Sequence, residues 1–232
     1  MSKKYLFRIL ALMMPLLFVY QNCNAVPTAS DGESRYLKPI FKKIKLQADI
    51  EYGKVINSEG KNQKLLLDLY APDRDSEKNR PAIMWIHGGA FLPQNDKTKG
   101  NIVALAKEFA ARGYVSISID YRLRQNPHED FQGMLNDTVN DAMLALEWIR
   151  KNAAAYGIDK NRIIVGGTSS GGQIAVNLCY KDQDDNGHWD KAGIIALIDL
   201  WGGINRDILG AIDKNDPPTV IVHGTKDKHD SL

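Results

Sequence analysis

The fold is decided by residues 162–172, which read Arg-Ile-Ile-Val-Gly-Gly-Thr-Ser-Ser-Gly-Gly. Residues 162–165 predict a strand, and a helix is expected over 171–179. Between them, residues 167–171 match the pattern Gly-x-Ser-x-Gly. A serine on so tight a turn needs neighbours without side chains, because the backbone must bend sharply and expose the hydroxyl. The stretch therefore predicts a strand, a turn and a helix, with Ser169 as a nucleophile on the turn.

Two other interpretations of this turn are weaker. Ser170 as the nucleophile would place Thr168 in the first glycine position, so Ser169 fits the pattern better. The other interpretation is a chance match. About one random chain in fifteen of this length and composition would contain the bare pattern. The strand before the turn and the helix after it make chance much less plausible. The helix also directs its N-terminal dipole at negative charge formed on the turn.

A second motif follows the apolar run 82–86, where residues 87–90 read His-Gly-Gly-Ala. Two glycines allow backbone N–H groups to converge on one point, which is how an oxyanion hole is built. The residue after the nucleophile adds a further N–H to such a hole. Gly88, Gly89 and Ser170 are therefore the candidate oxyanion donors. The three residues His-Gly-Gly alone also fit a plain turn, and the serine turn later in the chain is what makes them informative.

A third motif is Val-Ile-Val-His-Gly-Thr-Lys-Asp over residues 220–227. A strand ends at a His-Gly turn, and a carboxylate follows. Asp227 can orient and stabilise a catalytic imidazolium there, although an isolated aspartate at such a place is more often a solvated loop residue.

Short apolar runs and helical segments alternate along the rest of the chain. A hairpin is expected around residues 57–60. Strands are expected at 50–55, 65–70, 82–86, 115–119, 162–165, 194–200 and 219–222. Helices are expected at 102–111, at 171–179 and along a longer segment whose apolar face carries Leu135, Val139, Ala142, Leu146 and Ile149. This alternation predicts an α/β domain with a mostly parallel sheet and helices on both faces.

The motifs His-Gly-Gly-Ala, Asp120-Tyr121-Arg122-Leu123, Gly-Thr-Ser-Ser-Gly-Gly and His-Gly-Thr-Lys-Asp occur in this order. The order resembles the secreted esterase branch of the α/β-hydrolase superfamily, above all carboxylesterases of the hormone-sensitive-lipase and feruloyl or acetylxylan esterase type. The resemblance covers about residues 65–227. It implies the α/β-hydrolase fold, Ser169 as nucleophile, Asp227 as triad acid, oxyanion donors at Gly88, Gly89 and Ser170, and no cofactor.

The triad histidine departs from this resemblance. In the superfamily the order is Ser, Asp, His, whereas this sequence runs for only five residues beyond Asp227. The last strand, the histidine loop and the closing helix are thus expected to be missing, which leaves the strand 219–222 as an apolar edge. The chain has five histidines, His87, His128, His188, His223 and His229. None is expected to act as the base, since His229 lies too close to Asp227 to reach Ser169 as well.

Without a base the serine hydroxyl is a poor nucleophile, and loss of the base costs up to ~10⁶ in kcat in a serine hydrolase. The sequence therefore predicts a severely impaired esterase, either as a truncated product or as an incomplete record of a longer chain.

The first 25 residues predict a cleaved signal peptide. A basic stretch at 1–8 precedes an apolar run at 9–20, and Cys-Asn-Ala at 23–25 forms a cleavage site. A membrane anchor would need ~20 apolar residues, and a lipoprotein signal is disfavoured by the bulky and polar residues before Cys23. We therefore expect a signal peptide at 1–25, a leader segment at 26–48, and an α/β-hydrolase domain at 49–232 in a secreted or periplasmic protein.

Composition excludes other classes of protein. The formal charge of +2 offers no electrostatic case for a nucleic-acid partner.

Residues 182–187 match the start of a calcium-binding EF-hand loop, but the twelfth position is Gly193 where a glutamate is required. We therefore expect no metal site, and no membrane partner once the signal is cleaved.

Three functions stay open. The first is a secreted serine esterase acting on short acyl esters, including esters carried by polysaccharides. The second is a catalytically inactive binding protein of the same fold, and the third is a serine peptidase. Trp189 and Trp201 could stack on a sugar or an aromatic acyl group, although packing in the core is the commoner role of tryptophan.

Overall fold

The computed structural model describes residues 35–181, 190–204, 208 and 210–227. The expected signal peptide at 1–25 and the acidic turn at 182–187 lie outside the described residues, as do His188, Trp189 and His229.

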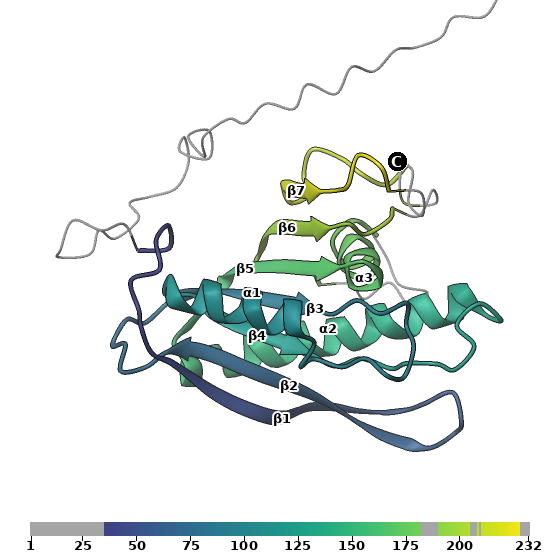
Figure 1. Cartoon of the computed structure of the whole chain (residues 1–232), viewed down its shortest axis with the longest axis horizontal. Coiled ribbons are helices and arrows are strands. Elements are labelled where there is room, and N and C mark those ends of the chain that lie inside the picture. Colours follow the sequence, from purple (N-terminus) through teal and green to yellow (C-terminus); the bar gives the residue numbers. More distant parts are fainter. Residues whose placement is uncertain (1–34, 182–189, 205–207, 209, 228–232) are drawn as a thin grey trace, which may run out of the picture.

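Within the described residues the domain is built on one sheet of seven strands in the order β1-β2-β4-β3-β5-β6-β7 (Figure 1). The elements are β1 (Ile44–Ile56), β2 (Asn62–Pro72), β3 (Arg80–Ile86), α1 (Gly100–Ala111), β4 (Val115–Ile119), α2 (Phe131–Tyr156), β5 (Ile158–Thr168), α3 (Ser170–Tyr180), β6 (Ile194–Leu200) and β7 (Thr219–Val222). The β1–β2 and β2–β4 pairs are antiparallel and the other four are parallel. The predicted mostly parallel α/β sheet is confirmed.

Helices cover both faces of this sheet. All residues of β3 and β4 are buried, and residues 82–86 of β3 form a continuous apolar run, as expected for a strand covered on both faces. Because side chains alternate along β3, Ile83 and Trp85 pack against α1, whereas Met84 and Ile86 join the core formed with α2 and α3. The prediction of a sheet covered on both sides is therefore correct.

The long helix α2 follows the pattern expected from its sequence. It begins after Asp130, whose carboxylate accepts the Gly133 N–H at 3.0 Å, and it ends at Gly157 with φ 63°. The five apolar positions expected on one face of this helix are all buried. In the part of the chain that the structure describes, no helix is long and apolar enough to cross a membrane.

The boundary expected between leader and domain is wrong. The expected leader reaches residue 48, but β1 begins at Ile44, which pairs with Pro72. Before it, the Tyr36 N–H donates to the Arg112 carbonyl at 2.8 Å, and the Phe41 N–H donates to the Ala111 carbonyl at 2.9 Å. Residues 35–48 thus belong to the domain. Backbone hydrogen bonds and strand pairing hold these residues in the domain. Such bonds do not require apolar side chains, so a search of the sequence for apolar runs does not detect them.

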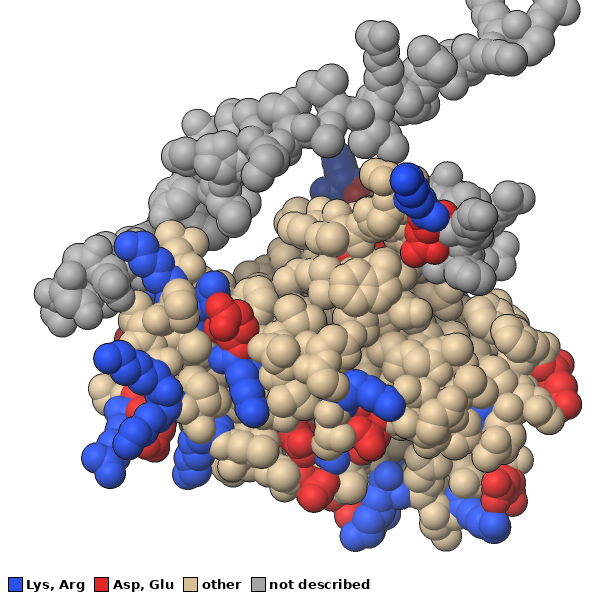
Figure 2. All heavy atoms as spheres, in the orientation of Figure 1, with Lys and Arg blue, Asp and Glu red and all other residues tan. Residues whose placement is uncertain are grey.

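The surface of the domain mixes charges of both signs. On the face that Figure 2 shows, Lys and Arg side chains lie close to Asp and Glu side chains. The ion pairs of the described residues include that of the Lys64 Nζ with the Glu51 Oε2 at 2.9 Å.

Candidate active site

The three sequence motifs meet at the carboxyl edge of the parallel strands. The Ser169 N–H donates to the Leu200 carbonyl at 3.0 Å, and the Trp201 N–H donates to the Val222 carbonyl at 2.7 Å. The ends of β5, β6 and β7 therefore lie side by side. Since neighbouring strands are about 4.8 Å apart, the turns carrying Ser169 and Asp227 share one edge, with β6 between them. This edge is where open α/β sheets bind ligands.

Ser169 stands on a strained turn. Its backbone has φ 50° and ψ −123°, a region that residues with side chains rarely occupy, and the α3 helix starts at the next residue. A Cβ on Gly167 would lie 2.1 Å from the Gly171 carbonyl oxygen, so this bend tolerates only glycine. The predicted sharp turn between strand and helix is confirmed, and it presents the side chain of a partly buried serine.

The turn after β3 packs directly on this serine. A Cβ added to Gly88 would come within 2.6 Å of the Thr168 carbonyl oxygen and 3.0 Å of the Ser169 Cβ. The absence of a side chain at Gly88 is therefore what allows the two motifs to touch. The structure brings together Ser169 and the His-Gly-Gly-Ala turn, as the sequence predicts.

One of the predicted oxyanion donors is already occupied. The Gly88 N–H donates to the Thr168 Oγ1 at 3.0 Å, so it ties the two turns together and is not open to a substrate. The expectation for Gly88 is corrected accordingly. Gly89, at φ 126°, and Ala90, at φ 53°, donate no backbone hydrogen bond to the described residues. The sequence did not indicate Ala90 as a donor. Only the tertiary structure shows that the Gly88 N–H is already hydrogen-bonded to Thr168, which leaves the amides of Gly89 and Ala90 as the open donors.

His87 braces this turn in its neutral form. Its imidazole is completely buried, and burial lowers the pKa of His87 to about 4. The neutral ring donates from Nδ1 to the Gly88 carbonyl at 2.8 Å. It stacks on the Tyr121 ring at 4.4 Å, and the Tyr121 hydroxyl donates to the His87 carbonyl at 2.8 Å. His87 thus holds the turn in shape and makes no hydrogen bond to the Ser169 hydroxyl.

The residue after Tyr121 fixes the next loop. Arg122 Nη2 lies 2.8 Å from the Asp141 Oδ1, and the Arg122 N–H donates to the Asp141 Oδ2 at 2.8 Å. Asp141 is fully buried on α2. Desolvation raises the pKa of this carboxyl, and the guanidinium opposes that shift. The motif Asp-Tyr-Arg thereby joins the end of β4 both to the His87 turn and to α2.

Asp227 lies beside a histidine of its own turn. The His223 Nε2 is 3.7 Å from the Asp227 Oδ2, which is an ion-pair distance but too long for a hydrogen bond. Both residues follow β7 at the edge that also carries Ser169. Among the described residues, no histidine is hydrogen-bonded to the Ser169 hydroxyl. The structure therefore places the nucleophile and the acid on one edge without joining them through an imidazole.

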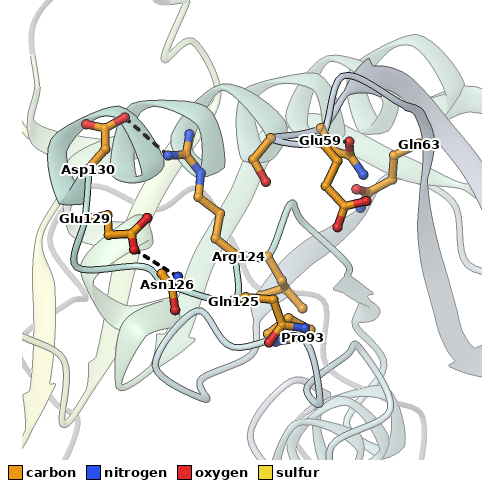
Figure 3. A pocket seen from close by; sticks show the side chains of 11 residues that line it. Glu59, Gln63, Pro93, Arg124, Gln125, Asn126, Glu129 and Asp130 are labelled. Carbon is orange, nitrogen blue, oxygen red and sulfur yellow. Dashed lines mark hydrogen bonds and ion pairs between the residues drawn. The ribbon is translucent and has the colours of Figure 1, made fainter.

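A polar cavity of about 530 Å³ opens between the β1–β2 hairpin and the loop that follows β4, and its lining includes no residue of the oxyanion turn (Figure 3). Its walls are the β1–β2 hairpin, the loop between β4 and α2, and Pro93 from the β3–α1 loop. Arg124 links this cavity to the turn, since its N–H donates to the Phe91 carbonyl at 3.0 Å. The lining offers amide and carboxylate groups, namely Asn57, Glu59, Gln63, Gln125, Asn126, Glu129 and Asp130.

Comparison with known proteins points to ester hydrolases. The family model BD-FAE matches residues 67–205. Phenmedipham hydrolase of Pseudarthrobacter oxydans is 40% identical over 111 residues, which are 46% of this chain and 21% of that protein. A probable isoprenylcysteine alpha-carbonyl methylesterase of Oryza sativa subsp. japonica is 32% identical over 149 residues, which are 62% of this chain and 33% of that protein. The chain thus spans between a fifth and a third of these curated relatives.

Solved structures agree on the fold. The thermophilic esterase Est2 of Thermogutta terrifontis, solved with propionate bound, matches with a TM-score of 0.62 and 25% identity. The match covers 79% of this chain and 73% of that structure. That protein is an esterase, and its fold is similar to the sheet and helices described above.

Proposed function

Because the chain belongs to the BD-FAE family of α/β-hydrolases, we propose that it hydrolyses carboxylic esters through an acyl-enzyme formed on Ser169. The observation that carries this proposal is the strained Ser169 backbone packed against Gly88, beside the open amides of Gly89 and Ala90. A serine held in this way has its hydroxyl and the oxyanion donors in one place, as acyl transfer requires.

The reaction has two half-steps. The Ser169 Oγ adds to the carbonyl carbon, and the negative charge on the carbonyl oxygen is stabilised by the amides of Gly89, Ala90 and Ser170. The carbon–oxygen bond to the alcohol then breaks, and the alcohol leaves with a proton. A water molecule adds to the acyl-enzyme and releases the acid, which restores the hydroxyl. In this scheme Asp227 is the acid that orients an imidazolium.

We expect turnover by the described residues alone to be slow. No described histidine is hydrogen-bonded to the Ser169 hydroxyl, and a serine without a base keeps its proton. The oxyanion hole and substrate binding alone can still leave ~10³–10⁴ of acceleration over water. This expectation supports the second candidate, a binding protein of the same fold that holds esters or sugars without turning them over.

The proposed substrates are short acyl esters of polar alcohols, including polysaccharide-linked ones. The polar cavity lined by Pro93 and Arg124 supports this proposal, because its amide and carboxylate groups suit hydroxyl groups of the alcohol. Trp201, 40% exposed at the end of β6, offers a stacking face on the same edge.

The decisive experiment compares three chains on p-nitrophenyl acetate. We expect hydrolysis by the wild-type chain, loss of that rate in Ser169→Ala, and an unchanged rate in Ser76→Ala, whose serine lies in an exposed loop far from the motifs. Equal rates in wild type and Ser169→Ala would contradict the esterase proposal, and saturable binding of a sugar ester would then favour the binding protein. Faster turnover of a p-nitroanilide than of the ester would favour a peptidase.

We further propose that the protein is exported and cleaved after Ala25, as its first 25 residues predict. Mass spectrometry of the exported protein should find Val26 at the N-terminus. A mature protein that still carries residues 1–25 would contradict the proposal.

A further inference from the structure

Lys97 is a buried lysine in the loop that begins with the oxyanion turn. Its side chain is only 7% exposed, and its ammonium faces three carboxylates. The Nζ lies 2.8 Å from the Asp49 Oδ1, 3.5 Å from the Asp68 Oδ1 and 3.6 Å from the Asp120 Oδ2. Burial alone lowers the pKa of Lys97, but the hydrogen bond to Asp49 and the nearby charges outweigh burial and raise it. The lysine is therefore a charged group at the centre of the cluster.

The three carboxylates come from three separate segments of the chain. Asp49 lies at the irregularity in β1, Asp68 on β2, and Asp120 directly after β4. The Asp49 N–H donates to the Asp68 Oδ1 at 2.9 Å, and the Lys97 N–H donates to the Asp120 Oδ1 at 2.7 Å. The lysine is thus held by its backbone as well as by its side chain. This cluster fastens the outer part of the β3–α1 loop to the sheet.

The inner part of the loop is fastened separately. The Gly88 N–H is bound to Thr168, and the Asn95 side-chain amide donates to the Gly89 carbonyl at 2.8 Å and to the Leu92 carbonyl at 3.0 Å. Between these points Ala90 and Phe91 have φ 53° and φ 60°. Strained conformations of this kind persist only where the surroundings hold them from more than one side.

We propose that Lys97 is a positioning residue for the oxyanion hole: its ammonium, bound by Asp49, Asp68 and Asp120, keeps the β3–α1 loop closed on the sheet. The strained backbone at Ala90 and Phe91 then keeps the N–H groups of Gly89 and Ala90 directed toward Ser169. Removal of the ammonium leaves Asp68 and Asp120, both largely buried, facing one another without a cation. The catalytic part of this proposal rests on the proposed function, whereas the effect on the loop does not.

The test is amide hydrogen exchange in Lys97→Met, read over residues 87–95 and compared with α2 and β5. We expect exchange at least tenfold faster over 87–95, and rates within twofold of the wild type in α2 and β5. Lys97→Arg, which keeps the cation, should restore most of the protection. Lys107→Met removes the same charge from an exposed position on α1 and should change nothing. Wild-type exchange over 87–95 in Lys97→Met, or an equal rise throughout the chain, overturns the proposal.

Asp49→Asn serves if Lys97→Met does not fold. The Asp49 side chain is 67% exposed, so its loss should leave the core intact and raise exchange over 87–95 about twofold. No rise in exchange over 87–95 overturns the proposal.

In the ester assay, Lys97→Met should lower kcat by 10- to 100-fold and leave KM within twofold, because oxyanion donors act in the transition state. If the wild type shows no turnover that depends on Ser169, the proposed function is wrong. The effect of Lys97 on the loop is still tested by hydrogen exchange, which does not require ester turnover.

Discussion

The two edges of the sheet are built in different ways. At one edge β1 is 13 residues long, is broken by irregularities after Gln47 and Glu51, and carries the ion pairs of Glu51 with Lys54 and Lys64. At the other edge β7 has four residues and no charge, and Val220, Ile221 and Val222 are 59%, 53% and 49% exposed. Irregularities and charges are the devices that protect an edge strand from pairing with other chains, and β7 has neither.

This difference divides the candidate site. Ser169 and the oxyanion turn lie on central strands whose contacts are buried, whereas Asp227 follows the least enclosed strand of the described sheet. Regions with few buried contacts open at lower free energy than the core. The nucleophile half of the site should therefore respond strongly to small changes, and the acid half only weakly.

The largest contrast is expected between two ion pairs. Asp141→Ala leaves Arg122 without its buried partner and should lower the free energy of unfolding by about 4 kcal/mol. Asp227→Ala removes a partly exposed partner of His223 and should cost less than ~1 kcal/mol. Urea unfolding of both variants checks this contrast. Similar losses in the two variants would show that the two halves are equally rigid.

The next largest difference in stability is expected between alanine substitutions at Gly167 and at Gly224. Gly167→Ala forces a Cβ to 2.1 Å from the Gly171 carbonyl oxygen, and it should cost about 3 kcal/mol and abolish ester turnover. In Gly224→Ala the new Cβ meets nothing closer than the Asp227 Cβ at 3.8 Å, so a change below ~0.5 kcal/mol is expected. Denaturation curves with the matching ester assay provide the measurement. A stable, active Gly167→Ala chain would argue against the strained turn.

A pH effect of up to about 3 kcal/mol is expected from His87. Its pKa falls from 6.5 to about 4 on folding, so protons bind the unfolded chain more readily. The stability that depends on neutral His87 is therefore complete above pH 6.5 and is lost as the pH falls toward 4. Stability measured between these values in wild type and His87→Gln checks the sign. The variant should lose this part of the slope, and an unchanged slope would contradict the assignment.

The smallest effect on stability is expected at the β7 edge. Ile221→Lys places a charge on a side chain that is already 53% exposed, so the free energy of unfolding should change by less than ~0.5 kcal/mol. Self-association should decrease, because a lysine blocks pairing of edge strands. Sedimentation at increasing protein concentration measures this. Equal self-association of Ile221→Lys and wild type would mean that chains do not pair through the exposed edge of β7.

Much of the fold could be predicted because buried parallel strands leave continuous apolar runs. The apolar run at 82–86 became β3, the strand expected at 115–119 became β4, and the five apolar positions expected on the long helix are part of its buried face. The start of the domain was missed, since residues 35–48 are held by backbone hydrogen bonds and by pairing with β2, which do not depend on an apolar pattern.

The sequence by itself determined the serine turn and the glycine turn, because both depend on local residues that lack a side chain. Only the tertiary structure decided which amides stay open, since the Thr168 hydroxyl that takes up the Gly88 N–H comes from a different strand. It also decided the place of Lys97, whose three carboxylate partners are brought together by β1, β2 and β4. Contacts between residues far apart in the chain leave no periodic pattern, and this is the physical reason that they appear only after folding.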